Sequence, residues 1–114
     1  MKENIIQEKS FVFALLTIEI YKKMVAQNEY VLSKQLLRSG TSIGANVEEA
    51  LAGISKRDFI AKMSISSKEA RETKYWLKLI DKSSIVEIDM TNSLIEIESI
   101  INILTKIVKT SQEK

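Results

Sequence analysis

Three glutamates, Glu49, Glu69 and Glu72, are the first candidates for chemistry in this sequence. Helical proteins can hold pairs of metal ions between inward-facing glutamates, but such sites also use Glu-x-x-His pairs. The sequence contains no His to complete one. We therefore expect no metal ion and no cofactor, and we interpret the carboxylates as hydrogen-bond acceptors.

The same carboxylates belong to a larger group of polar residues, which we expect near the middle of the helices predicted below. A buried polar group without a partner costs about 1–3 kcal/mol, so we expect these groups to form a closed network that fixes which helices pair. Lys68 or Arg71 would supply further donors. The predicted structural network consists of Ser42, Asn46, Glu49, Glu69 and Glu72.

No residue is predicted to be catalytic. The sequence has neither Cys nor His, which removes thiol chemistry and the commonest general base near neutral pH. The glycine pair Gly40-x-x-x-Gly44 lacks the Lys-Ser/Thr ending of a phosphate-binding loop. We therefore expect that the protein is not an enzyme.

A row of basic side chains is the main candidate for binding. Residues 55–83 contain eight basic and four acidic residues, whereas the whole chain has a net charge of +2. At helical spacing most of the basic residues of this segment lie on the side away from its apolar residues, and Tyr75 lies among them. Such a face can hold the phosphates of RNA or DNA, although an ordinary solvated face has the same pattern. The predicted nucleic-acid-binding residues are Lys68, Arg71, Lys74, Lys78 and Lys82.

The frame that positions these side chains is predicted to be helical. The chain has 114 residues, no Pro, three Gly and 45% hydrophobic residues, which is enough for one domain with one core. Apolar residues recur at steps of three and four, as in helices packed along one face. We expect helices over about 4–27, from just after Glu29 to 52, over 55–82 and over 91–109. They form a single domain over 1–114, an all-α, up-down-up-down antiparallel four-helix bundle.

The ends of these helices carry local signals. Ser55, followed three residues later by Asp58, resembles a capping box that starts the third helix. Residues 83–89 contain strand-like side chains without a partner strand, and we expect an ordered connection there. The last residues, 111–114, are expected to fray.

The second helix has an apolar line interrupted by small residues. Glycine inside a helix costs about 1 kcal/mol relative to Ala, so Gly40 and Gly44 indicate that a neighbouring helix approaches closely. We expect that neighbour to be the third helix, through Ser66, Ala70 and Thr73. The predicted buried line is Leu32, Leu36, Gly40, Ile43, Val47, Ala50 and Ile54.

The first and fourth helices carry more apolar residues than one buried stripe requires. Phe11, Leu15 and Ile18 extend the first helix's apolar surface, which favours contacts between copies of the chain. Isoleucines do the same in the fourth helix, at Ile95, Ile100, Ile103 and Ile107. We therefore expect a homo-oligomer.

The apolar cluster near the N-terminus does not have the form of a signal peptide. Glu3 and Glu8 precede it and Glu19 interrupts it, and no small-residue cleavage site follows. No segment approaches the length of a bilayer span. We therefore expect a cytoplasmic protein without a membrane partner.

Three spaced segments resemble a known family. They are QLLRSGTSIGANVEEA at 35–50, DFIAK at 58–62 and KEARETKYWL at 68–77. Together they closely resemble the four-helix-bundle proteins of the 23S ribosomal RNA intervening-sequence family, which is similar to the accessory protein of diversity-generating retroelements. The resemblance implies a four-helix bundle, a homopentamer, and RNA, DNA or an RNA-handling enzyme as partners. Its signature positions here are Ser42, Asn46, Glu49, Glu69, Glu72 and Trp76.

Two functions therefore remain open. The first is a homo-oligomeric accessory factor that binds nucleic acid through the basic row. The alternative is a self-assembling protein–protein interaction module without nucleic-acid binding. A steep loss of binding with added salt would distinguish the first from the second.

Overall fold

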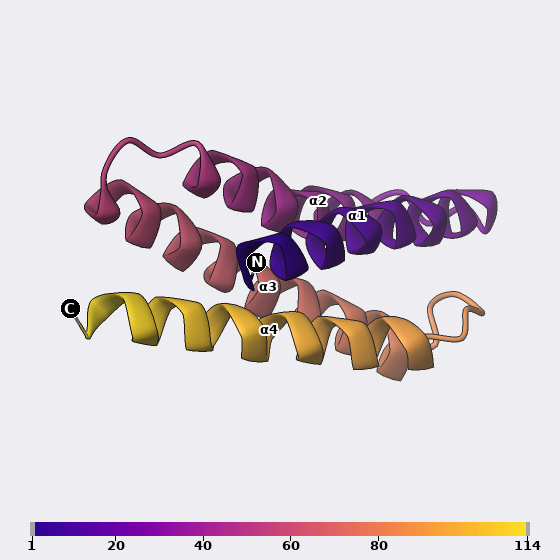
Figure 1. Ribbon diagram of the computed structural model, residues 1–114. Coiled ribbons are helices and arrows are strands. Elements are labelled where there is room, and N and C mark those ends of the chain that lie inside the picture. Colours follow the sequence, from indigo (N-terminus) through magenta and orange to yellow (C-terminus); the bar gives the residue numbers. More distant parts are fainter. Residues whose placement is uncertain (1, 114) are drawn as a thin grey trace.

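The computed structural model describes the backbone of residues 2–113 and the side chains of residues 5–113 (Figure 1). Four helices follow one another: α1 (Lys2–Ala26), α2 (Leu32–Leu51), α3 (Lys56–Ser83) and α4 (Thr91–Gln112). The chain reverses direction at alternate ends of the molecule. The prediction of an all-α antiparallel four-helix bundle is confirmed, and the described residues contain no strand.

The helices contact one another around a square. Contacts join α1 to α2, α2 to α3, α3 to α4 and α4 back to α1, so α1 and α3 lie on a diagonal. The bundle measures 47 × 20 × 20 Å. Because of the diagonal arrangement, the outer surfaces of α1 and α3 face away from each other.

Glu29 starts α2, a role that sequence analysis did not assign to it. One carboxylate oxygen accepts the backbone N–H of Ser33 at 2.7 Å, and the other accepts those of Val31 and Leu32 at 3.2 and 3.0 Å. Burial of Glu29, only 8% exposed, raises its pKa, but these hydrogen bonds outweigh burial and hold the pKa below its usual 4.5. The connection between α1 and α2 therefore contains a specific cap for α2, the Glu29 carboxylate.

The starts of α3 and α4 agree better with the sequence pattern. Ser55 Oγ accepts the backbone N–H of Asp58 at 3.0 Å, which confirms the predicted cap of α3. At the start of α4, Asp89 accepts the backbone N–H of Thr91 at 3.0 Å. Hydrogen bonds from Thr91 hold the pKa of Asp89 below its usual range.

The connection between α3 and α4 is ordered, as predicted. Val86 and Met90 are buried in it, and the side chain of Gln27 binds it from the end of α1. Gln27 Nε2 donates to the backbone oxygen of Glu87 at 3.0 Å, while the Glu87 N–H donates to Gln27 Oε1 at 2.7 Å. The expected fraying of 111–114 is wrong for the first two of these residues, because α4 continues to Gln112.

The core follows the predicted apolar line of α2 from Leu36 to Ala50, whereas Leu32 at its start is only partly buried. Ile54 lies beyond the helix and is 98% exposed, so the buried line ends at Ala50. Phe59 is only partly buried at the start of α3. The buried residues of α3 include the predicted Ser66, Ala70 and Thr73; the full set is Met63, Ser66, Ala70, Thr73, Leu77 and Ile80.

The glycines of α2 face a different helix from the one predicted. A Cβ added to Gly40 would lie 2.6 Å from Thr17 Cγ2, and one added to Gly44 would lie 3.3 Å from the backbone oxygen of Ser10. Both neighbours belong to α1. The hydroxyl of Ser39 and the backbone oxygen of Ile43 instead contact α3, so the prediction that the glycines pack against α3 is wrong.

The additional apolar residues predicted on two helices are exposed on α1 but mostly covered on α4. Phe11 is 63% exposed, and Val12, Leu15 and Ile18 are exposed beside it. On α4, Ile100 is buried and Ile103 and Ile107 pack partly against the core. Only Ile95 remains exposed from that set, because α4 presents a wider face to the core than one line of residues.

Candidate nucleic-acid interface

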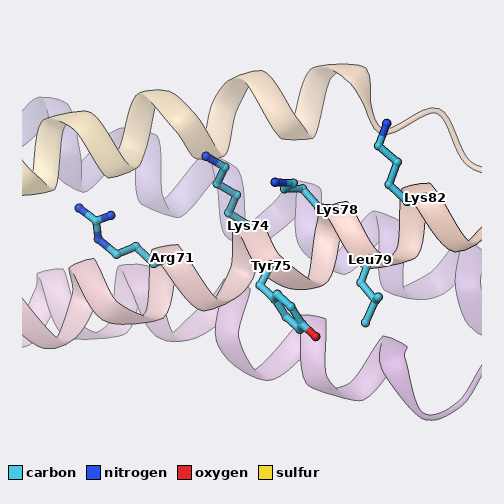
Figure 2. A pocket seen from close by; sticks show the side chains of 6 residues that line it. All are labelled: Arg71, Lys74, Tyr75, Lys78, Leu79 and Lys82. Atoms are coloured by element: carbon cyan, nitrogen blue, oxygen red, sulfur yellow. The ribbon is translucent and has the colours of Figure 1, made fainter.

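The outer surface of α3 gathers most of the predicted basic residues. The opposite side of the helix carries the buried line, from Met63 to Ile80, and this burial holds the basic side outward. A shallow, open depression of about 430 Å³ lies along it (Figure 2). Its lining consists of Arg71, Lys74, Tyr75, Lys78, Leu79 and Lys82.

The fifth predicted residue, Lys68, lies one turn before this depression. It is exposed on α3 but does not line the depression. Its spacing from Arg71 and Tyr75 puts it on the same side of the helix. It therefore extends the basic surface by one turn.

Two of the basic side chains are engaged with α4. Lys74 Nζ forms an ion pair with Glu98 at 2.7 Å, so most of its charge is compensated. Arg71 Nη2 donates to the hydroxyl of Thr105 at 3.0 Å. Because that hydroxyl is neutral, Arg71 keeps its full charge while its guanidinium is held in place.

The other cations are not compensated by direct pairing. Within the described part of the chain, Lys68, Lys78 and Lys82 form no ion pair within 4.0 Å. Together with Arg71 they give four uncompensated positive charges on one side of α3. We name this surface, with Tyr75 and Leu79, the basic face.

An aromatic side chain lies inside the basic face. Tyr75 is 58% exposed. Its ring meets that of Trp76 edge to face, with centroids 5.2 Å apart and planes at 70°. Figure 2 shows Tyr75 and Leu79 on one side of the depression, while Lys74, Lys78 and Lys82 extend to the other side, toward α4.

The predicted closed network does not form from its α2 members. Ser42 Oγ donates to the backbone oxygen of Arg38 at 2.6 Å, and Asn46 Nδ2 donates to that of Ser42 at 2.9 Å. Glu49 is exposed and pairs with Lys62 of α3 at 2.8 Å, which raises the pKa of that lysine. These are contacts within α2 or at the surface, so the expectation of a buried network is wrong here.

Glu69 and Glu72 do form a cluster, but around a residue that sequence analysis missed. Arg38 of α2 binds Glu69 at 3.3 Å and also binds Glu72. Glu72 further accepts the indole N–H of Trp76 at 2.9 Å. The donor is therefore Arg38 rather than Lys68 or Arg71. The register of the α2–α3 hairpin could have indicated this, because residues equally far from a short connection lie side by side.

The buried polar contacts between α2 and α3 involve hydroxyl groups. Ser66 Oγ donates to the backbone oxygen of Ile43 at 2.8 Å, and the hydroxyls of Thr73 and Ser39 are hydrogen-bonded at 2.9 Å. All three hydroxyl side chains are buried. In the described residues, no three carboxylates converge in a way that could hold a metal ion.

Comparison with known proteins agrees with this architecture. The family model described as 23S rRNA-intervening sequence protein matches residues 2–108. The chain belongs to this family. Membership accounts for the three segments between residues 35 and 77 that resemble it. No curated protein matches the chain.

A solved member of the family has the same fold. It is a protein of unknown function from the S23 ribosomal protein family of Bacteroides thetaiotaomicron VPI-5482, with a crystal structure at 1.70 Å resolution. The two sequences are 43% identical, and the match covers 96% of this chain and 99% of that one. The TM-score of 0.90 shows that the whole bundle is shared.

Proposed function

We propose that the protein is a non-enzymatic, homo-oligomeric accessory factor that binds RNA or DNA through the basic face of α3. The observation that carries this proposal is the group of four uncompensated cations on the basic face, three of which, Arg71, Lys78 and Lys82, line the open depression of about 430 Å³. Phosphate groups fit such a surface because it offers charge without an enclosed, shape-selective pocket. The family description, which names 23S rRNA, supports a role near structured RNA.

The exposed apolar residues of α1 support self-association. We define Phe11, Val12, Leu15 and Ile18 as the apolar row; all four are exposed in the single chain. Burying them against a second copy removes apolar surface from water. Because α1 and α3 lie on a diagonal, the apolar row and the basic face are separate surfaces of the bundle. The number of five copies comes from the family resemblance.

Repetition of the basic face would strengthen binding. Each copy offers only a few phosphate contacts, but copies held in one assembly act at high effective concentration toward the same strand. Such contacts carry little sequence information.

We propose that this activity takes place in the cytoplasm. The described residues contain no helix with the length and apolar character of a membrane span.

The nucleic-acid proposal is tested with a triple variant, Arg71→Ala, Lys78→Ala and Lys82→Ala. Its binding to single-stranded and structured RNA and DNA is compared with that of the wild type at two salt concentrations. The slope of log K against log salt should fall by about 0.7–0.9 for each phosphate that the variant no longer neutralises. A matched control, Lys22→Ala, Lys23→Ala and Lys34→Ala, removes three exposed lysines of α1 and α2 and should leave the slope nearly unchanged.

Two outcomes would overturn the proposal. If the wild type binds no nucleic acid at low salt, the protein–protein interaction module replaces it, with an RNA-handling enzyme as the partner to test. If the triple variant stays folded and assembled and keeps the wild-type affinity and salt slope, the contact surface lies elsewhere.

The assembly is tested by light scattering. Five copies would give five times the chain mass of 13.0 kDa. The double variant Phe11→Glu and Leu15→Glu should reduce the mass to that of one chain while circular dichroism remains helical, because both side chains are exposed within the bundle. A wild-type mass of one chain at micromolar concentration contradicts the oligomer.

A further inference from the structure

Tyr75 has a setting that phosphate binding alone does not explain. Its ring is 58% exposed, beside Leu79 and within a depression otherwise lined by cations. A Lys or Glu at this exposed helical position would be better solvated than a phenol ring. The aromatic and apolar side chains also occupy one edge of the depression, while the amino groups of Lys74, Lys78 and Lys82 extend toward the other (Figure 2).

This division matches the two chemical sides of a single polynucleotide strand. An unpaired strand presents phosphates along its backbone and the flat faces of its bases beside them, and bases stack readily on aromatic side chains. A duplex presents phosphates too, but its base faces are covered by neighbouring pairs. Only a single strand can therefore use both edges of the depression.

The dimensions of the basic face agree with a short strand segment. From Arg71 to Lys82 the helix rises about 16 Å, which corresponds to about five nucleotides at a stacked spacing of about 3.4 Å. Arg71 is already held by its hydrogen bond to Thr105. Less side-chain freedom is then lost when it binds a phosphate.

We infer that the basic face binds single-stranded nucleic acid in preference to duplex, with a base stacked on Tyr75 and phosphates on Arg71, Lys78 and Lys82. This inference rests on the proposed function and specifies its ligand. The edge-to-face contact with Trp76 occupies only part of the surroundings of the Tyr75 ring. The exposed part is what a base would cover.

The neighbouring tryptophan provides a direct signal of stacking. Trp76 is the single Trp of the chain, its ring centroid lies 5.2 Å from that of Tyr75, and its indole N–H is bound to Glu72. A base placed on Tyr75 should quench or shift the Trp76 fluorescence. Phosphate contact at the lysine edge should change it much less.

The experiment uses the full chain with four probes of equal length: fifteen-residue oligo(U) RNA, fifteen-residue oligo(dT) DNA, and fifteen-pair RNA and DNA duplexes (lengths of about three times the segment above). Three variants are compared. Tyr75→Leu keeps apolar bulk without a ring, Tyr75→Phe keeps the ring without the hydroxyl, and Tyr30→Leu removes another exposed tyrosine, located between α1 and α2.

The wild type should bind the single strands more tightly than the duplexes at equal salt. Tyr75→Leu should weaken single-strand binding about 5-fold or more, the lower end of the effect of removing one base–aromatic stack, and should leave duplex binding and the salt slope nearly unchanged. Tyr75→Phe should restore the affinity, and Tyr30→Leu should have no effect. Binding of oligo(U), oligo(dT) or both in this pattern supports the inference, and their ratio tells which polymer is preferred.

Other results overturn the inference, and they differ from the results that would overturn the proposed function. Equal or tighter duplex binding contradicts it, as does a Tyr75→Leu variant with unchanged single-strand affinity. If in either case the triple cation variant still loses binding, the proposed function stands and only the single-strand inference fails. If no probe binds the wild type, both fail.

Discussion

The two sides of α2 use small residues for different physical reasons. Toward α1, glycine allows the two backbones to approach, since a Cβ at position 40 would lie 2.6 Å from both Thr17 Cγ2 and Thr17 Oγ1. Toward α3, small hydroxyl side chains are buried and hydrogen-bonded across the interface, as in the pair Ser39 and Thr73. On the α1 side, the choice of residue is limited by space. On the α3 side, it is limited by the need for hydrogen bonds.

This difference shows that small residues in a helix carry two kinds of information. A glycine in the middle of a helix sacrifices stability that alanine would provide, so it indicates that no side chain fits. A serine or threonine occupies space, and when buried it indicates that a polar partner is near. The same helix therefore contacts two neighbours by two rules, and substitutions should separate them.

The largest effect is expected on the α1 side, from Gly40→Ala. Thr17 is buried and its hydroxyl donates to the backbone oxygen of Phe13 at 2.9 Å, so it cannot easily move from the added methyl group. Overpacking costs about 1–3 kcal/mol or more, which exceeds the helix-propensity gain of about 1 kcal/mol. We expect a net loss of about 1–2 kcal/mol in urea unfolding.

The double variant Thr17→Ala and Gly40→Ala tests the cause of this loss. Removing the Thr17 side-chain atoms that clash should recover part of the lost stability. The double variant should therefore lose less stability than the sum of the two single variants. If the losses simply add, Gly40 is required for another reason, and the steric explanation of the α1 side is wrong.

On the α3 side, Thr73→Val should cost about 1 kcal/mol. Valine keeps the shape of threonine, so the loss reports the hydrogen bonding of Thr73 with Ser39 and with the backbone oxygen of Glu69. The unfolding midpoint in urea measures it. A variant as stable as the wild type would show that space, not hydrogen bonding, governs both sides of α2.

Glu29→Gln acts on α2 as a whole and so provides a reference for both sides. The carboxylate caps the helix with both oxygens, and we expect a loss of about 0.5–1 kcal/mol at pH 7. Because the folded-state pKa of Glu29 is lowered, its contribution is complete above the unfolded pKa and disappears as the pH falls through the folded value.

The difference in melting temperature between wild type and Glu29→Gln should therefore narrow below about pH 4. Melting curves between pH 3 and pH 7 measure this. A difference that stays constant over this range would show that the charge of Glu29 does not contribute to the cap.

The smallest effect is expected from Glu49→Leu at the surface between α2 and α3. Its partner Lys62 is 2.8 Å away, but both side chains are partly exposed, and exposed ion pairs contribute little. The melting temperature should change by no more than about 3 °C, with unchanged oligomeric mass. A large change would restore the idea of a network that specifies helix pairing.

Helix number, the buried lines and the cap at Ser55 could be predicted because each depends on neighbours close in sequence. Residues at steps of three and four share one face of a helix whatever surrounds it, and Ser55 caps a backbone N–H only three residues away. The basic face was predictable for the same reason, since Arg71, Lys78 and Lys82 share a side of α3 by spacing alone.

The tertiary structure alone decided which neighbour each face meets. α2 lies between α1 and α3, and helical periodicity does not tell which of them covers Gly40 or Ser39. Lys74 pairs with Glu98 because the register between α3 and α4 brings the two side chains together. That register depends on how all the side chains of an interface pack at once, and no local pattern of residues contains it.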